Sequence, residues 1–140
     1  MEHQEKKSTV YYTDFRVPVG TSLQQKLEKL MRAAGLGEIE MDGRFAALTM
    51  PFGGPGNLAF LRPNYARTVA DVVRSQGGIP FLTDCNTLYP GRRKNAIEHL
   101  GAAQENGFGP LTTGCQVIIG DGLRGTDDVA VPLPDGKYVK

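Results

Sequence analysis

The chain has 140 residues, of which 40% are apolar and 22% are charged, and 16 Lys or Arg side chains face 15 Asp or Glu side chains. This length suits one domain with a single hydrophobic core. The charge balance does not show the basic excess typical of nucleic-acid-binding proteins. No apolar run of about 18 residues and no signal-peptide pattern indicates insertion in a membrane or export. The composition therefore predicts a globular cytoplasmic protein with no nucleic-acid and no membrane partner.

The first forty residues predict a tail, a strand and a helix. Residues 1–8 are polar without periodicity, which predicts a flexible tail. Residues 9–16 are rich in β-branched and aromatic side chains, which predicts a strand. Ser22 and Gln25 form a capping-box pattern at the start of a helix that ends at Gly35 or Gly37. The apolar stripe of this helix consists of Leu23, Leu27, Leu30, Met31 and Ala34.

Strands and helices alternate in the rest of the chain. Residues 45–50 are almost wholly apolar, as expected of a parallel strand buried on both faces. The next elements are a helix that begins at Pro63 and stops at Gly77, a strand over 81–83, a helix over 93–106 and a strand over 117–120. Residues 129–133 and 138–139 predict a closing β-hairpin around the turn at Pro134, Asp135 and Gly136.

This alternation predicts an α/β fold built from βαβ units. We expect a mostly parallel, Rossmann-like sheet with helices on both faces and a closing β-hairpin near the C-terminus. No linker or internal repeat divides the chain, so residues 9–140 are predicted to form a single domain.

The loop at 51–57 contains three glycines in seven residues. Such a loop lets backbone amides approach a ligand closely, but it serves equally as a strained connector. It has neither the lysine and hydroxyl residue of a phosphate-binding P-loop nor the dinucleotide fingerprint spacing.

Polar side chains follow the predicted strands, and in an open α/β sheet this is where ligands bind. The candidate ligand-binding residues are Asn57, Arg62, Asp84, Asn86, Thr87, Tyr89, Arg92 and Asp121. Carboxylates, amides, hydroxyls and arginines together suit an anionic or hydroxylated small molecule. Asp and Asn also satisfy backbone groups in turns, which is the alternative for each residue taken singly. Asp84 and Asp121 are candidates for an acid/base pair or for sharing a cation.

The cysteines and the helical histidine favour structural roles. Cys85 and Cys115 are the only cysteines, and two reduced thiols fit a cytosolic protein better than a disulfide. They are too few for an iron–sulfur cluster, which needs about four cysteine ligands, so no cofactor or metal site is predicted within this chain. His99, inside a helix whose predicted apolar face is Ala96, Ile97, Leu100 and Ala103, is expected to be a satisfied or surface side chain rather than a catalytic one.

Four motifs carry a resemblance that runs over nearly the whole chain from Val10. They are residues 56–65, residues 82–89, Asn95 with 99–100 and 105–108, and residues 118–123. In these motifs the chain resembles domain-of-unknown-function family 362, whose members are often labelled iron–sulfur proteins. Longer members continue into a second α/β half, and many carry cysteines for four-iron clusters. The resemblance implies that this chain is the N-terminal part of the family fold, as a natural short form or a shortened chain.

The chain also departs from the family pattern. A lysine, a histidine and a glutamate are common around the second-strand loop of the family, and Thr49, Pro51 and Gly54 stand at those places here. The three ionisable side chains are absent here, so a charged or metal-binding role that they have in relatives does not carry over to these positions.

Three functions follow from these observations. The first is a bacterial small-molecule-binding α/β domain related to iron–sulfur-associated redox proteins, with its site at the strand ends. The second is a non-catalytic assembly module that forms a homodimer or pairs with a missing half, and it would show an uncovered apolar surface or sheet edge. The third, a stand-alone electron-transfer protein, is disfavoured by the absent cysteines. None of the residues identifies a reaction.

Overall fold

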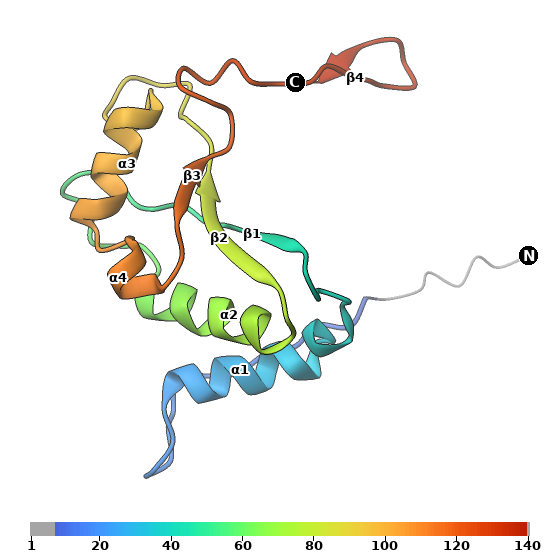
Figure 1. Ribbon diagram of the computed structural model, residues 1–140, viewed down its shortest axis with the longest axis vertical. Helices are drawn as coiled ribbons and strands as arrows, with labels where there is room; N and C mark the ends of the chain where they lie inside the picture. The colour runs from blue at the N-terminus through green and yellow to red at the C-terminus, as the bar shows by residue number, and fades with distance from the viewer. Residues whose placement is uncertain (1–7, 140) are drawn as a thin grey trace, which may run out of the picture. The chain divides into compact units, whose positions relative to one another are not determined.

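The computed structural model describes residues 8–139 and divides the chain into two compact units, Met1–Glu40 and Met41–Lys140. Figure 1 shows their helices and strands. Residues 1–7, most of the predicted tail, lie outside the described residues.

The first unit is built around α1 (Leu23–Ala33), followed by the short 3-10 helix η1 (Leu36–Glu38). The capping box is confirmed, since Ser22 Oγ accepts a hydrogen bond from the Gln25 N–H and Gln25 Oε1 accepts one from the Ser22 N–H. Gly35 has a left-handed φ of 92° just after the helix, which confirms the predicted stop.

The strand predicted over 9–16 is wrong, because the described residues before α1 form no strand. The segment is extended but has no strand beside it to receive its backbone hydrogen bonds. Lys26 holds it instead, since its Nζ donates to Asp14 Oδ1 at 2.7 Å and to the carbonyl oxygen of Arg16 at 2.7 Å. Side-chain composition alone therefore misled the prediction.

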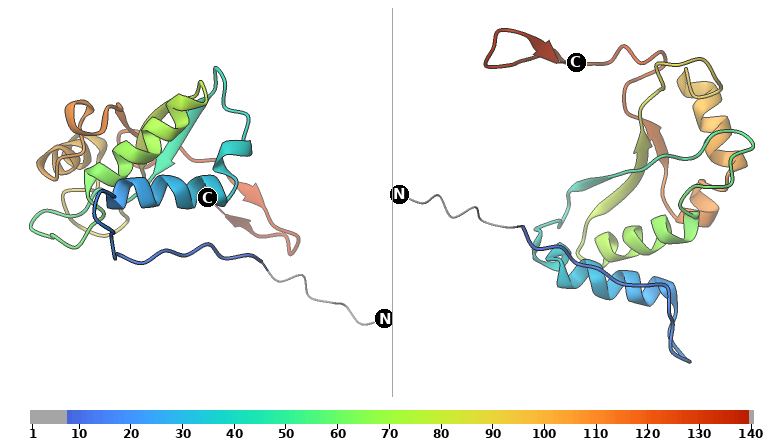
Figure 2. Two further views of the ribbon diagram at one scale, coloured as in Figure 1. Left: turned by 90° about the horizontal axis from the view of Figure 1, so that it is seen from below. Right: turned by 180° about the vertical axis from the view of Figure 1, so that it is seen from behind.

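The second unit contains a parallel three-stranded sheet in the order β1-β2-β3, as Figures 1 and 2 show. Its strands are β1 (Phe45–Thr49), β2 (Ile79–Asp84) and β3 (Val117–Ile119). Between them run α2 (Pro63–Ser75), α3 (Ala96–Glu105) and the short α4 (Pro110–Thr113). The predicted α/β fold with a parallel sheet is thus confirmed.

The core of this unit lies on one face of the sheet. Leu82 of β2 and Ile119 of β3 belong to the same buried cluster as Ala66 and Ala70 of α2 and Ala103 of α3. Because residues of both helices join this cluster, α2 and α3 cover the same face. Within this unit the helices between the strands therefore do not lie on both faces of the sheet, as was predicted, because both crossovers run in the same direction across the order β1-β2-β3. Phe52 and Phe108, both fully buried, fill the space beside them, with ring centroids 5.2 Å apart.

The prediction that β1 is buried on both faces is wrong. Phe45 is 77% exposed, and exposure alternates along the strand, with Ala46 and Leu48 partly buried. Strand side chains point alternately to the two faces of a sheet, so only one face of β1 is packed. An apolar run cannot distinguish a strand covered on both faces from one with a bare apolar face.

Local signals set several element boundaries. Pro63 is the first residue of α2, as predicted. Gly77 has a left-handed φ of 78°, and a Cβ there would lie 2.1 Å from Asp42 Oδ1. α3 begins later than predicted because Asn95 caps it and accepts from the Glu98 N–H at 3.0 Å.

The predicted hairpin is confirmed as β4 (Val131–Pro132) paired antiparallel with β5 (Tyr138–Val139). Its turn is closed by the hydrogen bond from the Gly136 N–H to the Leu133 carbonyl oxygen. No helix in the described part of the chain is long and apolar enough to cross a membrane.

Replacing Leu82 with alanine tests the one-sided core. Leu82 is fully buried, so Leu82→Ala should lower the free energy of unfolding by about 2 to 5 kcal/mol through lost burial and a residual cavity. Leu88→Ala, the same substitution at a leucine that is 100% exposed, should change it by less than about 0.5 kcal/mol. Urea unfolding followed by circular dichroism measures both, and equal effects would contradict this core assignment.

Candidate functional site

The ends of β2 and β3 bring two of the predicted loops together. Asp84 is paired with Ile119 in the parallel register, and the Gly120 N–H donates to the Asp84 carbonyl oxygen at 3.0 Å. The loops that leave these strands therefore start side by side. This is the position at which open α/β sheets bind ligands.

Asn86 and Asp121 link the two loops directly. The Asn86 backbone N–H donates to both carboxylate oxygens of Asp121, at 2.9 and 3.0 Å, and Asn86 Nδ2 donates to Asp121 Oδ1 at 3.0 Å. Asn86 Nδ2 also donates to the Gly122 carbonyl oxygen at 2.9 Å. These two residues come together, as predicted, and both carboxylate oxygens of Asp121 already accept hydrogen bonds from Asn86.

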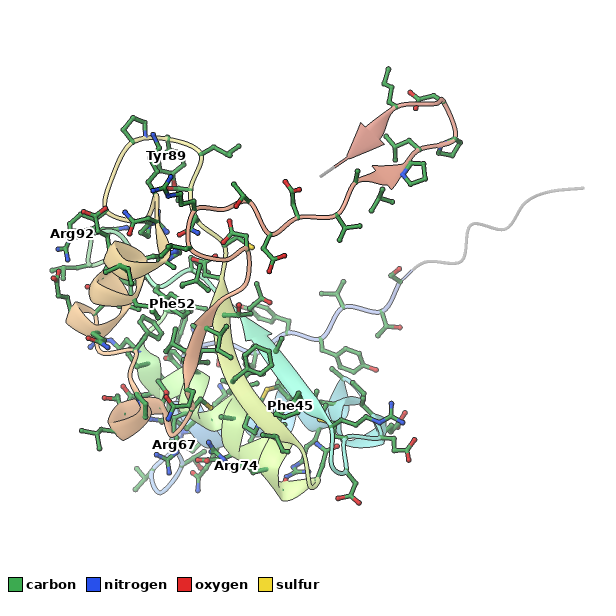
Figure 3. All side chains as sticks on the ribbon, turned by 45° about the horizontal axis from the view of Figure 1, so that its top comes forward. Phe45, Phe52, Arg67, Arg74, Tyr89 and Arg92 are labelled. Carbon is green, nitrogen blue, oxygen red and sulfur yellow. The ribbon has the colours of Figure 1, made fainter. Side chains whose placement is uncertain are left out.

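Asp84 faces a buried histidine. Its Oδ1 accepts from the Cys85 N–H at 2.9 Å, and its Oδ2 lies 3.4 Å from Nε2 of His99 on α3. The His99 side chain is fully buried, whereas 20% of the Asp84 side chain is exposed. The His99 ring packs edge-on against Phe52, with centroids 5.8 Å apart, and Phe52 lies next to α3 in Figure 3.

Three buried polar atoms at this place have no hydrogen-bond partner among the described residues. They are Asn86 Oδ1 and the two ring nitrogens of His99. The 3.4 Å approach of His99 to Asp84 is within ion-pair range but is not aligned as a hydrogen bond. Buried polar atoms are nearly always paired, so this group marks an unusual site.

Two side chains here have shifted pKa values. Burial lowers the pKa of His99 below its ordinary 6.5, with the positive charge of Arg93 adding to the effect and the Asp84 carboxylate opposing it. Partial desolvation by its neighbours raises the pKa of the Cys85 thiol although the residue is exposed, and the negative charges of Asp121 and Asp84 raise it further. Cys85 is therefore a protonated thiol at neutral pH rather than a reactive thiolate.

The prediction that His99 is a satisfied or surface side chain is wrong. The residue is neither a surface side chain nor a hydrogen-bonded one, and Ile97, predicted on the apolar face, is 69% exposed. Positions 96, 99, 100 and 103 follow helical spacing, and this periodicity was the available signal that His99 lies on the inward face.

The other predicted ligand residues have local partners or lie elsewhere. Asn57 Oδ1 accepts from the Ala59 N–H at 2.8 Å, and Thr87 Oγ1 donates to the Tyr89 carbonyl oxygen at 3.3 Å. Tyr89 Oη accepts from Arg93 Nη2 at 3.1 Å. Arg62 is the exposed residue that precedes α2. For Asn57, the alternative of a turn-stabilising side chain is the one that its contact supports.

Arg92 is engaged by a carboxylate of the protein itself. Its two terminal nitrogens donate to the two oxygens of Glu105, each at 2.7 Å, in a bidentate pair. This pair raises the pKa of Arg92 and lowers that of Glu105. Figure 3 labels Arg92 beside α3. An anionic ligand would have to compete with Glu105 for this guanidinium.

The glycine-rich loop packs into the core. Phe52 is fully buried, and its carbonyl oxygen accepts from Asn106 Nδ2 at 2.8 Å. A Cβ at Gly53 would lie 2.7 Å from the Phe60 ring and 2.8 Å from Asn106 Nδ2, and its φ is 79°. These contacts explain the glycine without a ligand and support the connector interpretation.

The described residues were also compared for hollows, metal-binding groups and thiols. A shallow hollow of about 410 Å³ is formed along α1 by Gly20, Thr21, Gln25, Glu28, Lys29 and Arg32, all in the first unit. Within residues 8–139, no three His, Cys, Asp or Glu side chains are grouped so that they could hold a metal ion. Both cysteines are free thiols, Cys85 exposed and Cys115 buried.

The fold and the strand-end cluster define an α/β protein with a one-sided parallel sheet. The sequence model of the domain of unknown function family DUF362 matches residues 47–140. This span covers more than half of the chain, so the protein belongs to the DUF362 family, as the sequence motifs predicted. Neither the curated proteins nor the solved structures contain a match to this chain.

The buried His99 should make folding stability depend on pH. Because its folded pKa is below 6.5, the unfolded chain takes up a proton first as the pH falls through 6.5. The contribution of neutral His99 is complete well above pH 6.5 and is progressively lost as the pH falls below it. Urea unfolding between about pH 5 and 8 should therefore show the free energy of unfolding of the wild type falling below about pH 6.5, with a shallower slope in His99→Leu. The same slope in both proteins would contradict the assignment.

Proposed function

We propose that this protein binds a neutral, hydroxyl-bearing small molecule at the ends of β2 and β3. The observation that carries the proposal is the set of buried polar atoms without partners, Asn86 Oδ1 and both ring nitrogens of His99. Burying such atoms unpaired costs about 1 to 3 kcal/mol each. A ligand that forms hydrogen bonds with these atoms would recover this free energy. In a core that binds no ligand, the same unpaired atoms would only destabilise the fold.

The partners that the site offers match a hydroxyl group. Asn86 Oδ1 and Asp84 Oδ2 accept hydrogen bonds, and a neutral His99 has one nitrogen that donates and one that accepts. A hydroxyl group both donates and accepts, so several on one small molecule can pair with the mixed set. The exposed fifth of the Asp84 side chain is the point at which a ligand first meets the cluster.

The local charge favours a neutral ligand over an anionic one. The negative charges of Asp84 and Asp121 already raise the pKa of Cys85, so their field would repel a phosphate or carboxylate group. The nearby Arg92 is paired with Glu105. Of the two ligand classes that the sequence suggests, the hydroxylated one is therefore the better match.

A thermal-shift experiment on the full chain tests this function. We expect glucose, ribose or myo-inositol to raise the melting temperature of the wild type, with about 2.7 kcal/mol of stabilisation at 100 times the dissociation constant. The shift should be absent in Asp84→Asn, which keeps the side-chain volume but replaces the acceptor carboxylate. Asp135→Asn, the same substitution in the hairpin turn, should retain the full shift.

The phosphate esters of the same compounds serve as the second arm. Each variant is compared with itself in the presence and absence of ligand, so that its own change in stability cancels. A shift produced only by the phosphate esters would contradict a neutral ligand. A shift that survives Asp84→Asn would contradict the site.

A further inference from the structure

His99 is the buried titratable side chain beside Asp84. Its ring is fully buried, its Nε2 lies 3.4 Å from Asp84 Oδ2, and neither ring nitrogen has a hydrogen-bond partner among the described residues. A buried neutral imidazole ordinarily donates from one nitrogen and accepts at the other. Both groups of this ring are therefore still open to a ligand or to a proton.

The charged groups that act on His99 come from three parts of the second unit. Asp84 ends β2, Asp121 follows β3, and Arg93 precedes α3. Burial and the Arg93 guanidinium favour the neutral ring, whereas the two carboxylates favour the protonated one. Burial is the largest of these effects, so the pKa of His99 lies below its ordinary 6.5. The Cys85 thiol, whose pKa is raised, stays protonated at neutral and acidic pH.

The neutral ring gives the strand ends their capacity to bind a hydroxyl group. One of its nitrogens accepts a hydrogen bond and the other donates one. Asp84 Oδ1 already accepts from the Cys85 N–H at 2.9 Å, and Oδ2 is the acceptor beside the ring. A ligand hydroxyl can therefore donate to the carboxylate or to the ring and accept from the ring as well.

Protonation of His99 removes this capacity. Both nitrogens of an imidazolium donate, so the ring loses its acceptor. The 3.4 Å between Nε2 and Asp84 Oδ2 is already within ion-pair range, and a small rotation of either side chain would give a charge-assisted hydrogen bond. Asp84 Oδ2 is then held by the protein itself. A ligand hydroxyl thus loses two of its acceptors through one proton.

We propose that ligand binding at the strand ends is controlled by the protonation of His99: the neutral ring binds the hydroxyl-bearing ligand, and the protonated ring excludes it by pairing with Asp84. This inference rests on the proposed function and adds the regulation of the same site. Because ligand and proton compete for one ring, each weakens the binding of the other by the same factor. Acidification therefore releases the ligand.

Isothermal titration calorimetry of the full chain with glucose, ribose and myo-inositol between about pH 5 and 8 tests the coupling. The dissociation constant should be steady near pH 8 and rise by up to about tenfold per pH unit below the pKa of His99, as expected for competition with one proton. His3→Gln is the matched control, because His3 is the only other histidine in the sequence, and its pH dependence should equal that of the wild type. Circular dichroism at each pH checks that the chain is folded.

Proton NMR gives a second measurement, on the ring itself. In His3→Gln the only histidine Cε1–H resonance belongs to His99, and it should titrate with a pKa below 6.5. A saturating concentration of the sugar should lower this pKa further. In the same background without sugar, Asp84→Asn removes a charge that favours the imidazolium and should also lower the pKa of His99, whereas Asp135→Asn should leave it unchanged.

The possible failures separate the coupling from the function. A dissociation constant that stays the same from pH 5 to 8, or a His99 pKa that the sugar does not lower, would overturn the coupling and leave sugar binding intact. A His99 pKa that is the same in Asp84→Asn would overturn the pairing by which the ligand is excluded. No binding of any of the three compounds at pH 8 would contradict the proposed function, and the coupling with it.

Discussion

The parallel pairing of β2 with both of its neighbours is the constraint on which the second unit depends. β2 is the central strand, and its register with β1 and β3 fixes which side chains share a face. Side chains alternate along a strand, so Leu82 enters the core while Phe81 and Thr83 point to the other side. A shift of one residue in this register would exchange the two faces completely.

The same alternation creates the polar cluster. Asp84 is two residues after Leu82 and therefore points to the helix side of the sheet, where α3 carries His99 on its inward face. The next residues leave the strand, and Asn86 meets Asp121 from the end of β3. The buried and the more exposed side of β2 are thus two consequences of one alternation, because successive residues of the strand point to opposite faces of the sheet.

Local rules predicted the elements well where one side chain satisfies a neighbouring backbone group. The capping box at Ser22, the proline that starts α2 and the turn of the hairpin are of this kind. The strand predicted over 9–16 was wrong because a strand also needs a partner, which no local pattern reports. The start of α3 was placed too early because the capping role of Asn95 was missed.

The sequence by itself determined the parallel α/β class, the family and the convergence of Asp84, Asn86 and Asp121. Local periodicity shows that strands and helices alternate, and general topology places the carboxyl ends of parallel strands at one edge of the sheet. Tertiary structure alone decided that Arg92 is held by Glu105, that His99 is buried without a hydrogen bond, and that one face of β1 is bare. These features depend on which residues distant in sequence come into contact and on what covers each face. Composition and spacing carry no information about either.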